Sequence, residues 1–324
     1  MFFGNKDYKR ISFTLAAVTA TSLFALMQTG CAPENNGKKT IVTTTFPSYE
    51  WTETVLGDRK DDFEVTWLAS NGVDMHSFQP SAGDIALVSS CDLLIQNGGE
   101  SEAWLEPIVE QRESKGLKSL NLSAHLEDGN MLLCEETVEG MTVEEKEEEE
   151  AYDEHIWLSL ENASQMVEGI AGSIASIDSD NTAYYTENAE KYCEEITALE
   201  KEFGEKLSGR TKPVLVADRF PFRYLTADYG LVYYAAFPGC SAETESSFET
   251  VIFLADEIKY DNLDVIYVLE KSDRKLAETV IENSGVSGVE IRELNSMQSV
   301  TMDDYANGAT YIEIMKENLE ALTE

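Results

Sequence analysis

Residues 182–209, TAYYTENAEKYCEEITALEKEFGEKLSG, decide the fold of this chain. Apolar side chains recur in this stretch at steps of three and four residues: Tyr185, Ala189, Tyr192, Ile196, Leu199 and Phe203. Such spacing predicts one long amphipathic helix, which ends near Gly209. Either Asp180 or Asn181 can cap its start.

Short apolar runs alternate with helix-length stretches on the N-terminal side of this helix. The β-branched run at 40–45 (TIVTTT) stops at Pro47, and a helix-like stretch follows at 49–56. Further strand-like runs are at 63–68, 92–96 and 117–120. This alternation of strands and helices predicts a parallel sheet.

The same alternation begins again after the long helix. Its strand-like and helix-like segments are at 214–217, 222–228, 231–235, 247–257, 265–269 and 273–283. The predicted fold class is therefore α/β, with two lobes, each a mainly parallel sheet flanked by helices, joined by one long rigid helix. Ligands of open α/β sheets bind beyond the carboxyl ends of the strands, so loops of both lobes would contribute to a site between them.

These patterns predict five segments. We expect an export signal at 1–31, a polar tether at 32–39 and a first lobe at 40–165, which contains an acidic loop at 134–154. A helical connector at 166–210, which includes the long helix, and a second lobe at 211–324 complete the chain. The loop's EEKEEEE core has little to bury, so it either collects cations weakly or is merely solvated.

The first thirty-one residues resemble a bacterial lipoprotein signal. A basic segment with Lys6, Lys9 and Arg10 precedes an apolar run at 11–27, which ends just before Gly30-Cys31. The run is shorter than a typical membrane span and contains several Thr and Ser, which favours cleavage. We therefore expect acylation of Cys31 and a lipid anchor on the extracytoplasmic face of the cell membrane, although Gln28 stands where such signals usually have Leu.

The charge balance excludes one class of partner. The chain has 61 acidic and 24 basic side chains and a formal net charge of -37. This charge repels phosphate backbones, so nucleic acid is not an expected partner. The same charge raises the local concentration of cations, or it reflects only a soluble acidic surface.

Four cysteines follow Cys31 in the sequence: Cys91, Cys134, Cys193 and Cys240. Their spacing is irregular and includes no CxxC pair, so it carries no metal-finger signature. Buried free thiols and one disulfide are both compatible with this spacing.

Two of the three histidines have a carboxylate two residues before them. His76 follows Asp74 in GVDMHSFQPS, and His155 follows Asp153 in DEHIWLS. A carboxylate that holds one ring nitrogen fixes the tautomer that offers the other nitrogen to a metal. His125 has no such neighbour, and we expect no ligand role for it.

Several ordered motifs resemble the metal-receptor family of zinc and manganese ABC importers: Gly72-x-Asp74-x-His76-x-Phe78-x-Pro80-Ser81, Asp84, Asn97-Gly98, Glu102-Ala103-Trp104-Leu105 and Asp153-x-His155-x-Trp157-Leu158. The resemblance covers residues 40–322. It implies two lobes joined by a rigid helix, with the metal between them and with His76 and His155 as first-lobe ligands. It also implies zinc, or alternatively manganese, as the transported ligand and an ABC permease as partner. We expect a monomer without catalytic residues.

The second lobe departs from the family pattern. Arg219 occupies the slot of the third ligand, and a guanidinium has no lone pair to donate. Asn295 occupies the slot of the fourth ligand, and an amide oxygen ligates a metal only weakly. Other candidate ligands at predicted strand ends are Glu243, Glu245 and Glu270, each of which can instead pair with Arg219 or Arg223.

Three functions of different classes follow from these residues. The first is capture of a metal without turnover, by His76, His155 and donors from the second lobe. The second is binding of an anion or a metal chelate through Arg219, with Asp218, Asp74 and Asp153 as neighbouring groups. The third, a zinc hydrolase, needs an open metal position and a general base, and its usual HExxH motif is absent from the sequence.

Overall fold

The computed structural model describes residues 37–127, 130–134, 152–240 and 246–323. Within these ranges, no helix has both the length and the apolar character that a membrane crossing requires. Residues 1–31 with Cys31, most of the tether, residues 135–151 of the acidic loop, Glu243 and Glu245 lie outside the described residues.

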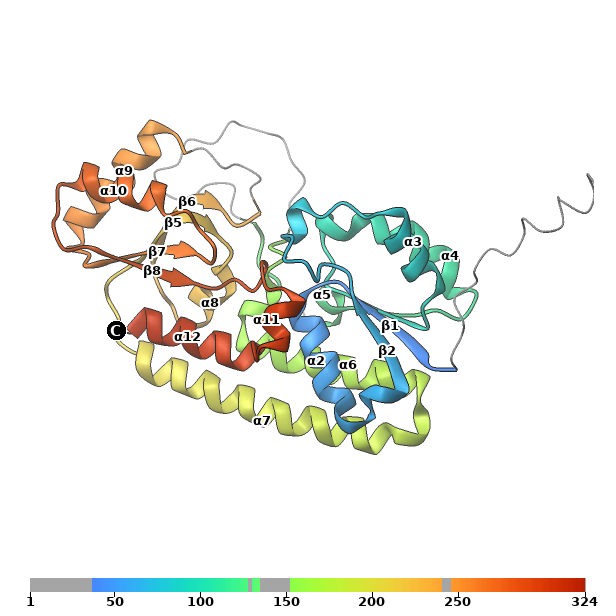
Figure 1. Ribbon diagram of the computed structural model, residues 1–324. Helices are drawn as coiled ribbons and strands as arrows, with labels where there is room; N and C mark the ends of the chain where they lie inside the picture. The colour runs from blue at the N-terminus through green and yellow to red at the C-terminus, as the bar shows by residue number, and fades with distance from the viewer. Residues whose placement is uncertain (1–36, 128–129, 135–151, 241–245, 324) are drawn as a thin grey trace, which may run out of the picture. The chain divides into compact units, whose positions relative to one another are not determined.

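The described chain contains two four-stranded sheets (Figure 1). The first sheet has the order β2-β1-β3-β4, formed by β1 (Lys39–Thr43), β2 (Phe63–Trp67), β3 (Leu93–Gln96) and β4 (Lys118–Asn121). The second has the equivalent order β6-β5-β7-β8, formed by β5 (Val214–Phe220), β6 (Tyr233–Pro238), β7 (Val265–Leu269) and β8 (Glu290–Leu294). All strand pairs in both sheets are parallel, which confirms the predicted fold class.

The first lobe's helices begin at side chains that cap them. In α2 (Phe46–Leu56), Thr45 and Ser48 form a reciprocal capping box and Pro47 lies in the first turn. In α3 (Ala82–Ser90), Ser81 and Asp84 form the same arrangement. The remaining helical segments of this lobe are η1 (Gly57–Asp62), η2 (Met75–Ser77), η3 (Glu100–Leu105), α4 (Glu106–Glu113), α5 (Leu122–His125) and η4 (Ile156–Leu158).

Helices cover both faces of the second sheet. On one side α9 (Phe248–Tyr260) and α10 (Lys275–Ser284) pack together against β5, β6 and β7, where they enclose a separate apolar cluster. On the other side α12 (Tyr311–Thr323) lies between β8 and α7 (Figure 1). Two short helices, α8 (Arg223–Asp228) and α11 (Met302–Ala306), complete this part of the chain.

The long helix is α7 (Thr182–Leu207), a helix of 26 residues that follows α6 (Leu160–Ile177) and the short η5 (Ser179–Asn181). Every apolar position predicted for its buried face is buried, together with Leu207. Near its start Tyr185 packs edge-on against Phe63 of β2, and near its end Phe203 stacks on Tyr229 after α8. The helix therefore joins both lobes, as predicted.

The predicted cap of α7 is wrong in one respect. Asn181 stands at the capping position, but its side chain bonds no backbone N–H of the helix. Its amide instead donates to Asp178 Oδ2 at 2.8 Å, because the chain enters α7 through the 3-10 turn η5.

One apolar core continues through both lobes. Trp51 of α2 packs edge-on against Tyr311 of α12, with ring centroids 5.0 Å apart. The Tyr311 hydroxyl donates to the Trp157 carbonyl at 2.7 Å, and Trp157 Nε1 donates to the Ser296 carbonyl at 2.9 Å. Residue 157 is thereby tied to the C-terminal part of the chain, directly beside His155.

Candidate metal centre

The two histidines of the sequence motifs face each other. His76 Nε2 lies 3.2 Å from His155 Nε2, and the ring centroids are 5.1 Å apart. His155 is fully buried, and the side chain of His76 is 9% exposed. Loops that are 79 residues apart in the sequence thus meet at one pair of nitrogen atoms.

The His76 ring is held on the side away from this contact. Asp74 caps η2 by accepting from the His76 backbone N–H at 2.9 Å. Ser101 Oγ lies 2.9 Å from His76 Nδ1, and Glu154 Oε2 lies 3.8 Å from the same nitrogen. His76 Nε2 is therefore the nitrogen that is presented to His155.

Asp153 orients His155 in the same way. Its Oδ1 lies 2.8 Å from His155 Nδ1 and accepts from the His155 backbone N–H at 2.8 Å. The Tyr224 hydroxyl of the second lobe donates to the Asp153 carbonyl at 2.8 Å. A carboxylate on one ring nitrogen is the usual partner of a metal-binding histidine.

The Asn97-Gly98-Gly99 turn shapes the approach to His155. Asn97 Nδ2 donates to the Glu154 carbonyl at 2.9 Å, and the Ser101 backbone N–H donates to Glu154 Oε1 at 2.9 Å. Gly99 has φ +101°, and a Cβ at this position would lie 2.5 Å from Glu154 Cγ. Only glycine fits here, because a larger residue would meet both strain and a collision beside the second histidine.

The surroundings shift the pKa values of the two imidazoles in opposite directions. Burial lowers the pKa of His155, but the Asp153 carboxylate outweighs it and raises that pKa to about 10. Burial and the neighbouring His155 lower the pKa of His76 to about 4. These shifts favour a proton on His155 rather than on His76, and a metal that binds both ring nitrogens must displace any proton held there.

A cysteine of the second lobe joins the two histidines. His76, His155 and Cys240, which follows β6, each offer one ligand atom, and these atoms all lie within 4.8 Å of one another. Cys240 Sγ lies 3.0 Å from Cys134 Sγ, and both cysteines are free thiols. Cys134, Asp153 and Cys240 form a second group within the same limit. No other such group of His, Cys, Asp or Glu occurs in the described part of the chain.

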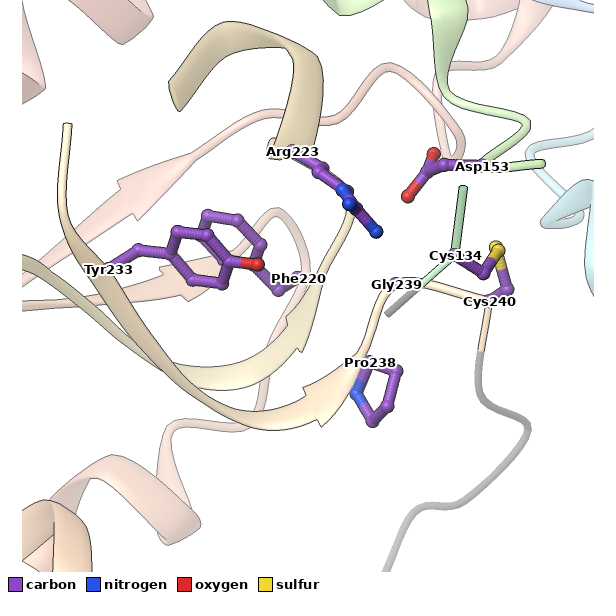
Figure 2. Close-up of a pocket in the computed structure, with 8 residues that line it drawn as sticks. All are labelled: Cys134, Asp153, Phe220, Arg223, Tyr233, Pro238, Gly239 and Cys240. Atoms are coloured by element: carbon purple, nitrogen blue, oxygen red, sulfur yellow. The ribbon is translucent and has the colours of Figure 1, made fainter. Parts of the chain in front are cut away.

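Figure 2 shows the pocket beside these thiols. The sulfur atoms of Cys134 and Cys240 lie next to each other, and the Arg223 side chain points toward Asp153. Phe220 and Tyr233 form the opposite wall as parallel stacked rings with centroids 3.8 Å apart. The pocket thus has one aromatic wall and one wall of sulfur and carboxylate.

Sequence reasoning missed Cys240 and Cys134 as possible ligands, because their spacing matches no metal motif. The signal that could have found Cys240 is its position directly after β6. The end of that strand lies at the carboxyl edge of the second sheet, where ligands of such sheets bind.

Arg219 pairs with a residue of the other lobe. Its Nη2 lies 2.5 Å from Asp74 Oδ2, and both side chains are less than a quarter exposed. Its backbone N–H donates to Asp218 Oδ1 at 2.9 Å. The guanidinium in the third ligand slot is thus engaged with the same carboxylate that caps the turn of His76.

Glu270 and Asn295 serve other partners. The Glu270 carboxylate accepts from the Ser296 backbone N–H and hydroxyl, both at 2.8 Å, and from Ser299. Burial raises the pKa of Glu270. Asn295 Oδ1 accepts from the Met297 backbone N–H at 2.8 Å. The structure therefore does not bring these two predicted ligands into the histidine–cysteine group.

His125 lies on the surface at the end of α5, away from this group. Its ring packs against Gly169 of α6, where an added Cβ would come within 2.6 Å of it. No ligand role was expected for His125, and it belongs to neither potential metal-binding group in the described residues.

Comparison with known proteins finds relatives that are described as zinc-binding or zinc-uptake proteins. Residues 41–324 match the family model described as ZnuA, zinc-uptake complex component A, periplasmic. The chain is 32% identical over 321 residues to the zinc-binding lipoprotein AdcA of Streptococcus pneumoniae serotype 4, covering 98% of this chain and 61% of that protein. It is 30% identical over 295 residues to the high-affinity zinc uptake system protein ZnuA of Bacillus subtilis, covering 91% and 90% of the two chains.

The solved structures agree with these relatives. The Zn(II)-bound ZnuA-like domain of S. pneumoniae AdcA superposes with a TM-score of 0.70 at 30% identity, covering 89% of this chain and 98% of that domain. The metal-dependent lipoprotein YcdH of B. subtilis gives a TM-score of 0.71 at 27% identity. The chain therefore spans the ZnuA-like part of the longer AdcA protein and nearly all of B. subtilis ZnuA.

Proposed function

This chain belongs to the ZnuA family of periplasmic zinc-uptake components, and on that premise we propose that it captures a zinc ion between its lobes and delivers it to an ABC permease. Capture without chemical turnover is the role of this family of transport receptors. The proposed setting is the extracytoplasmic face of the membrane, with a monomeric chain held by a lipid on Cys31.

The distance between the two histidine nitrogens carries this proposal. Zinc binds imidazole nitrogen at about 2.0–2.1 Å, so two ligands of a tetrahedral zinc ion lie about 3.3 Å apart. His76 Nε2 and His155 Nε2 are 3.2 Å apart, and Ser101 and Asp153 hold the other ring nitrogens. The spacing of this pair therefore suits one zinc ion bound to both rings.

Zinc is preferred over manganese on chemical grounds. At sites with nitrogen ligands, affinity rises from manganese toward zinc in the order of first-row divalent ions. The relatives named above are described as zinc proteins, which favours the same ion. Manganese is the alternative ligand that the titration must include.

Within the described residues, no contact favours the alternative of an anionic ligand. The Arg219 guanidinium already forms an ion pair with Asp74 at 2.5 Å, and the Arg219 backbone N–H donates to Asp218. An incoming carboxylate would have to displace Asp74, which also caps the turn that carries His76.

Isothermal titration of zinc, and then of manganese, into the chelator-treated chain tests the proposal. We expect tight one-to-one zinc binding that a His76→Ala, His155→Ala double variant loses. His125→Ala is the matched control, since this exposed histidine lies outside the site, and it should bind as the parent does. A parent chain that takes up neither metal would contradict the proposal.

A further inference from the structure

We propose that Cys240 and Cys134 complete the metal site, so that zinc is held by two imidazoles and two thiolates. This inference rests on the proposed capture of zinc by His76 and His155 and names the donors that the histidines lack. Cys240 comes from the second lobe, and Cys134 comes from the segment just before residues 135–151.

The histidine pair alone is an incomplete site. A closed zinc site takes four N, S or O donors, so two are missing. The residues in the family's second-lobe slots do not supply them, because Arg219 is a cation paired with Asp74 and Asn295 Oδ1 accepts from Met297. Glu270, the remaining described candidate, is bound to Ser296 and Ser299.

The Cys240 sulfur lies where one missing donor would be needed, and the Cys134 sulfur lies beside it. In a tetrahedral zinc site a nitrogen and a sulfur ligand are about 3.6 Å apart and two sulfur ligands about 3.8 Å apart. The Cys240 sulfur and a ring nitrogen of each histidine already lie within 4.8 Å of one another. The 3.0 Å between Cys134 Sγ and Cys240 Sγ would have to widen by about 0.8 Å. The Cys134 sulfur, which groups with Cys240 and Asp153, would also have to move closer to the two histidine nitrogens to give a four-ligand site.

The backbone places Cys240 at this point. Gly239 lies so close to β5 that an added Cβ would come 2.5 Å from the Phe220 carbonyl oxygen. A glycine at 239 therefore allows β6 to end tightly against β5, which brings the next residue to the junction of the lobes. Asp153 holds His155 Nδ1 and lies beside both sulfurs, so it is a positioning residue for the whole group.

This donor set predicts the specificity of the site. Thiolates are soft ligands that favour zinc, whereas manganese favours carboxylate, carbonyl and water oxygen. Two thiolates also neutralise the charge of one Zn²⁺ ion at a largely buried site. We therefore expect manganese to compete poorly at concentrations that saturate the chain with zinc.

Cobalt(II) substitution in the full, reduced and chelator-treated chain tests the inference, because thiolate ligands give cobalt an intense charge-transfer band in the near ultraviolet. The parent should show this band at one cobalt per chain. Cys240→Ser should remove much of the band and weaken zinc binding more than about 100-fold, since even outer partners of metal ligands cost 10–100-fold. Cys134→Ser should also reduce the band. Cys31 is common to every variant, so the differences report on the substituted cysteine.

Cys193→Ser is the matched control, because this thiol lies on α7 and contacts the Ser164 carbonyl, outside the site. It should leave the band and the zinc affinity unchanged. Histidine-dependent, one-to-one cobalt binding without the band would overturn the inference, and so would parental zinc affinity in Cys240→Ser. Both results would leave the proposed function intact. A parent chain that binds no metal would overturn both the inference and the proposed function.

Alkylation followed by mass spectrometry gives a readout that does not depend on affinity. Zinc should protect Cys134 and Cys240 from alkylation, and chelation should expose both. A disulfide between them in the zinc-loaded chain would overturn the inference, because its sulfurs could no longer bind as thiolates. Exported proteins meet oxidising conditions, which makes this disulfide the state that competes with zinc binding.

Discussion

Buried carboxyl groups serve different purposes at different positions of this chain. Asp153 stays beside His155 and fixes the ring that faces the site. Glu270 accepts hydrogen bonds from the turn that follows β8. Glu50 of α2 accepts from the Tyr192 hydroxyl of α7 at 2.9 Å, and burial raises its pKa from 4.5 to about 7. Glu50 therefore links the protonation of a single residue to the stability of the fold.

We predict that Glu50 makes the metal-free chain less stable as the pH rises from about 5 to 8. Because the folded pKa lies above the unfolded value, the stabilising contribution of Glu50 is complete below about 4.5 and is lost as the pH rises through about 7. The shift corresponds to about 3 kcal/mol of unfolding free energy. Urea unfolding at pH 5 and pH 8 measures this loss.

Glu50→Gln should shrink the difference between the two pH values, since the amide does not titrate. Burial likewise raises the pKa of Glu102 to about 7. Glu102 is present in both the parent and the variant, so its contribution to the pH dependence cancels in the comparison. An equal pH dependence in parent and variant would show that Glu50 is ionised in the folded chain throughout.

At the scale of elements, α7 is the part of the fold that the sequence pattern describes most directly. Its buried stripe meets β2 through Tyr185 and α8 through Phe203, so one helix supports both lobes. The exposed side carries ion pairs four residues apart, such as Lys201 with Glu205, which contribute little to stability. The apolar stripe therefore dominates the contribution of this helix.

Phe203→Ala should lower the unfolding free energy by about 3–5 kcal/mol, because it removes a fully buried ring and leaves a cavity beside Tyr229. Chemical denaturation followed by circular dichroism measures the loss. Glu205→Ala on the exposed side should change stability by less than about 0.5 kcal/mol. Equal effects of the two substitutions would mean that the stripe does not hold the helix in place.

For the whole molecule, the important contacts are those that cross between the lobes. Arg219 of β5 pairs with Asp74 before η2, Trp157 bonds the Ser296 carbonyl and Tyr224 bonds the Asp153 carbonyl. Each of these contacts involves a residue within two positions of His76 or His155. The relative position of the lobes and the geometry of the proposed metal site are therefore coupled.

Arg219→Ala should release zinc about five-fold faster, since it removes an ion pair of about 1 kcal/mol that holds the lobes together around the site. Stopped-flow transfer of zinc to a chelator measures the release rate. Lys212→Ala, which removes a pair with Asp264 outside the site, is the control and should leave the rate unchanged. An unchanged rate in Arg219→Ala would show that the pair does not restrain the closed lobes.

Local patterns in the sequence were sufficient for the elements and for two members of the candidate site. Strand and helix periods depend on neighbouring residues, so the two parallel sheets and α7 followed from them. His76 and His155 were indicated by short motifs that keep each histidine beside its own carboxylate. The helix cap predicted at Asn181 was wrong for a reason that is also local. The 3-10 turn η5 precedes α7, and the Asn181 side chain bonds Asp178 there and does not cap the helix.

The sequence by itself determined the fold class and the long helix and pointed to the two candidate histidines, because each depends on contacts between residues close in the chain. Only the tertiary structure decided that Cys240 lies at the histidine pair, that Cys134 lies beside Cys240 and that Arg219 meets Asp74. Their partners are 85–164 residues away in the sequence. Such contacts depend on the order of the strands, the tight end of β6 at Gly239 and the packing of the two lobes, none of which leaves a periodic signal in the sequence.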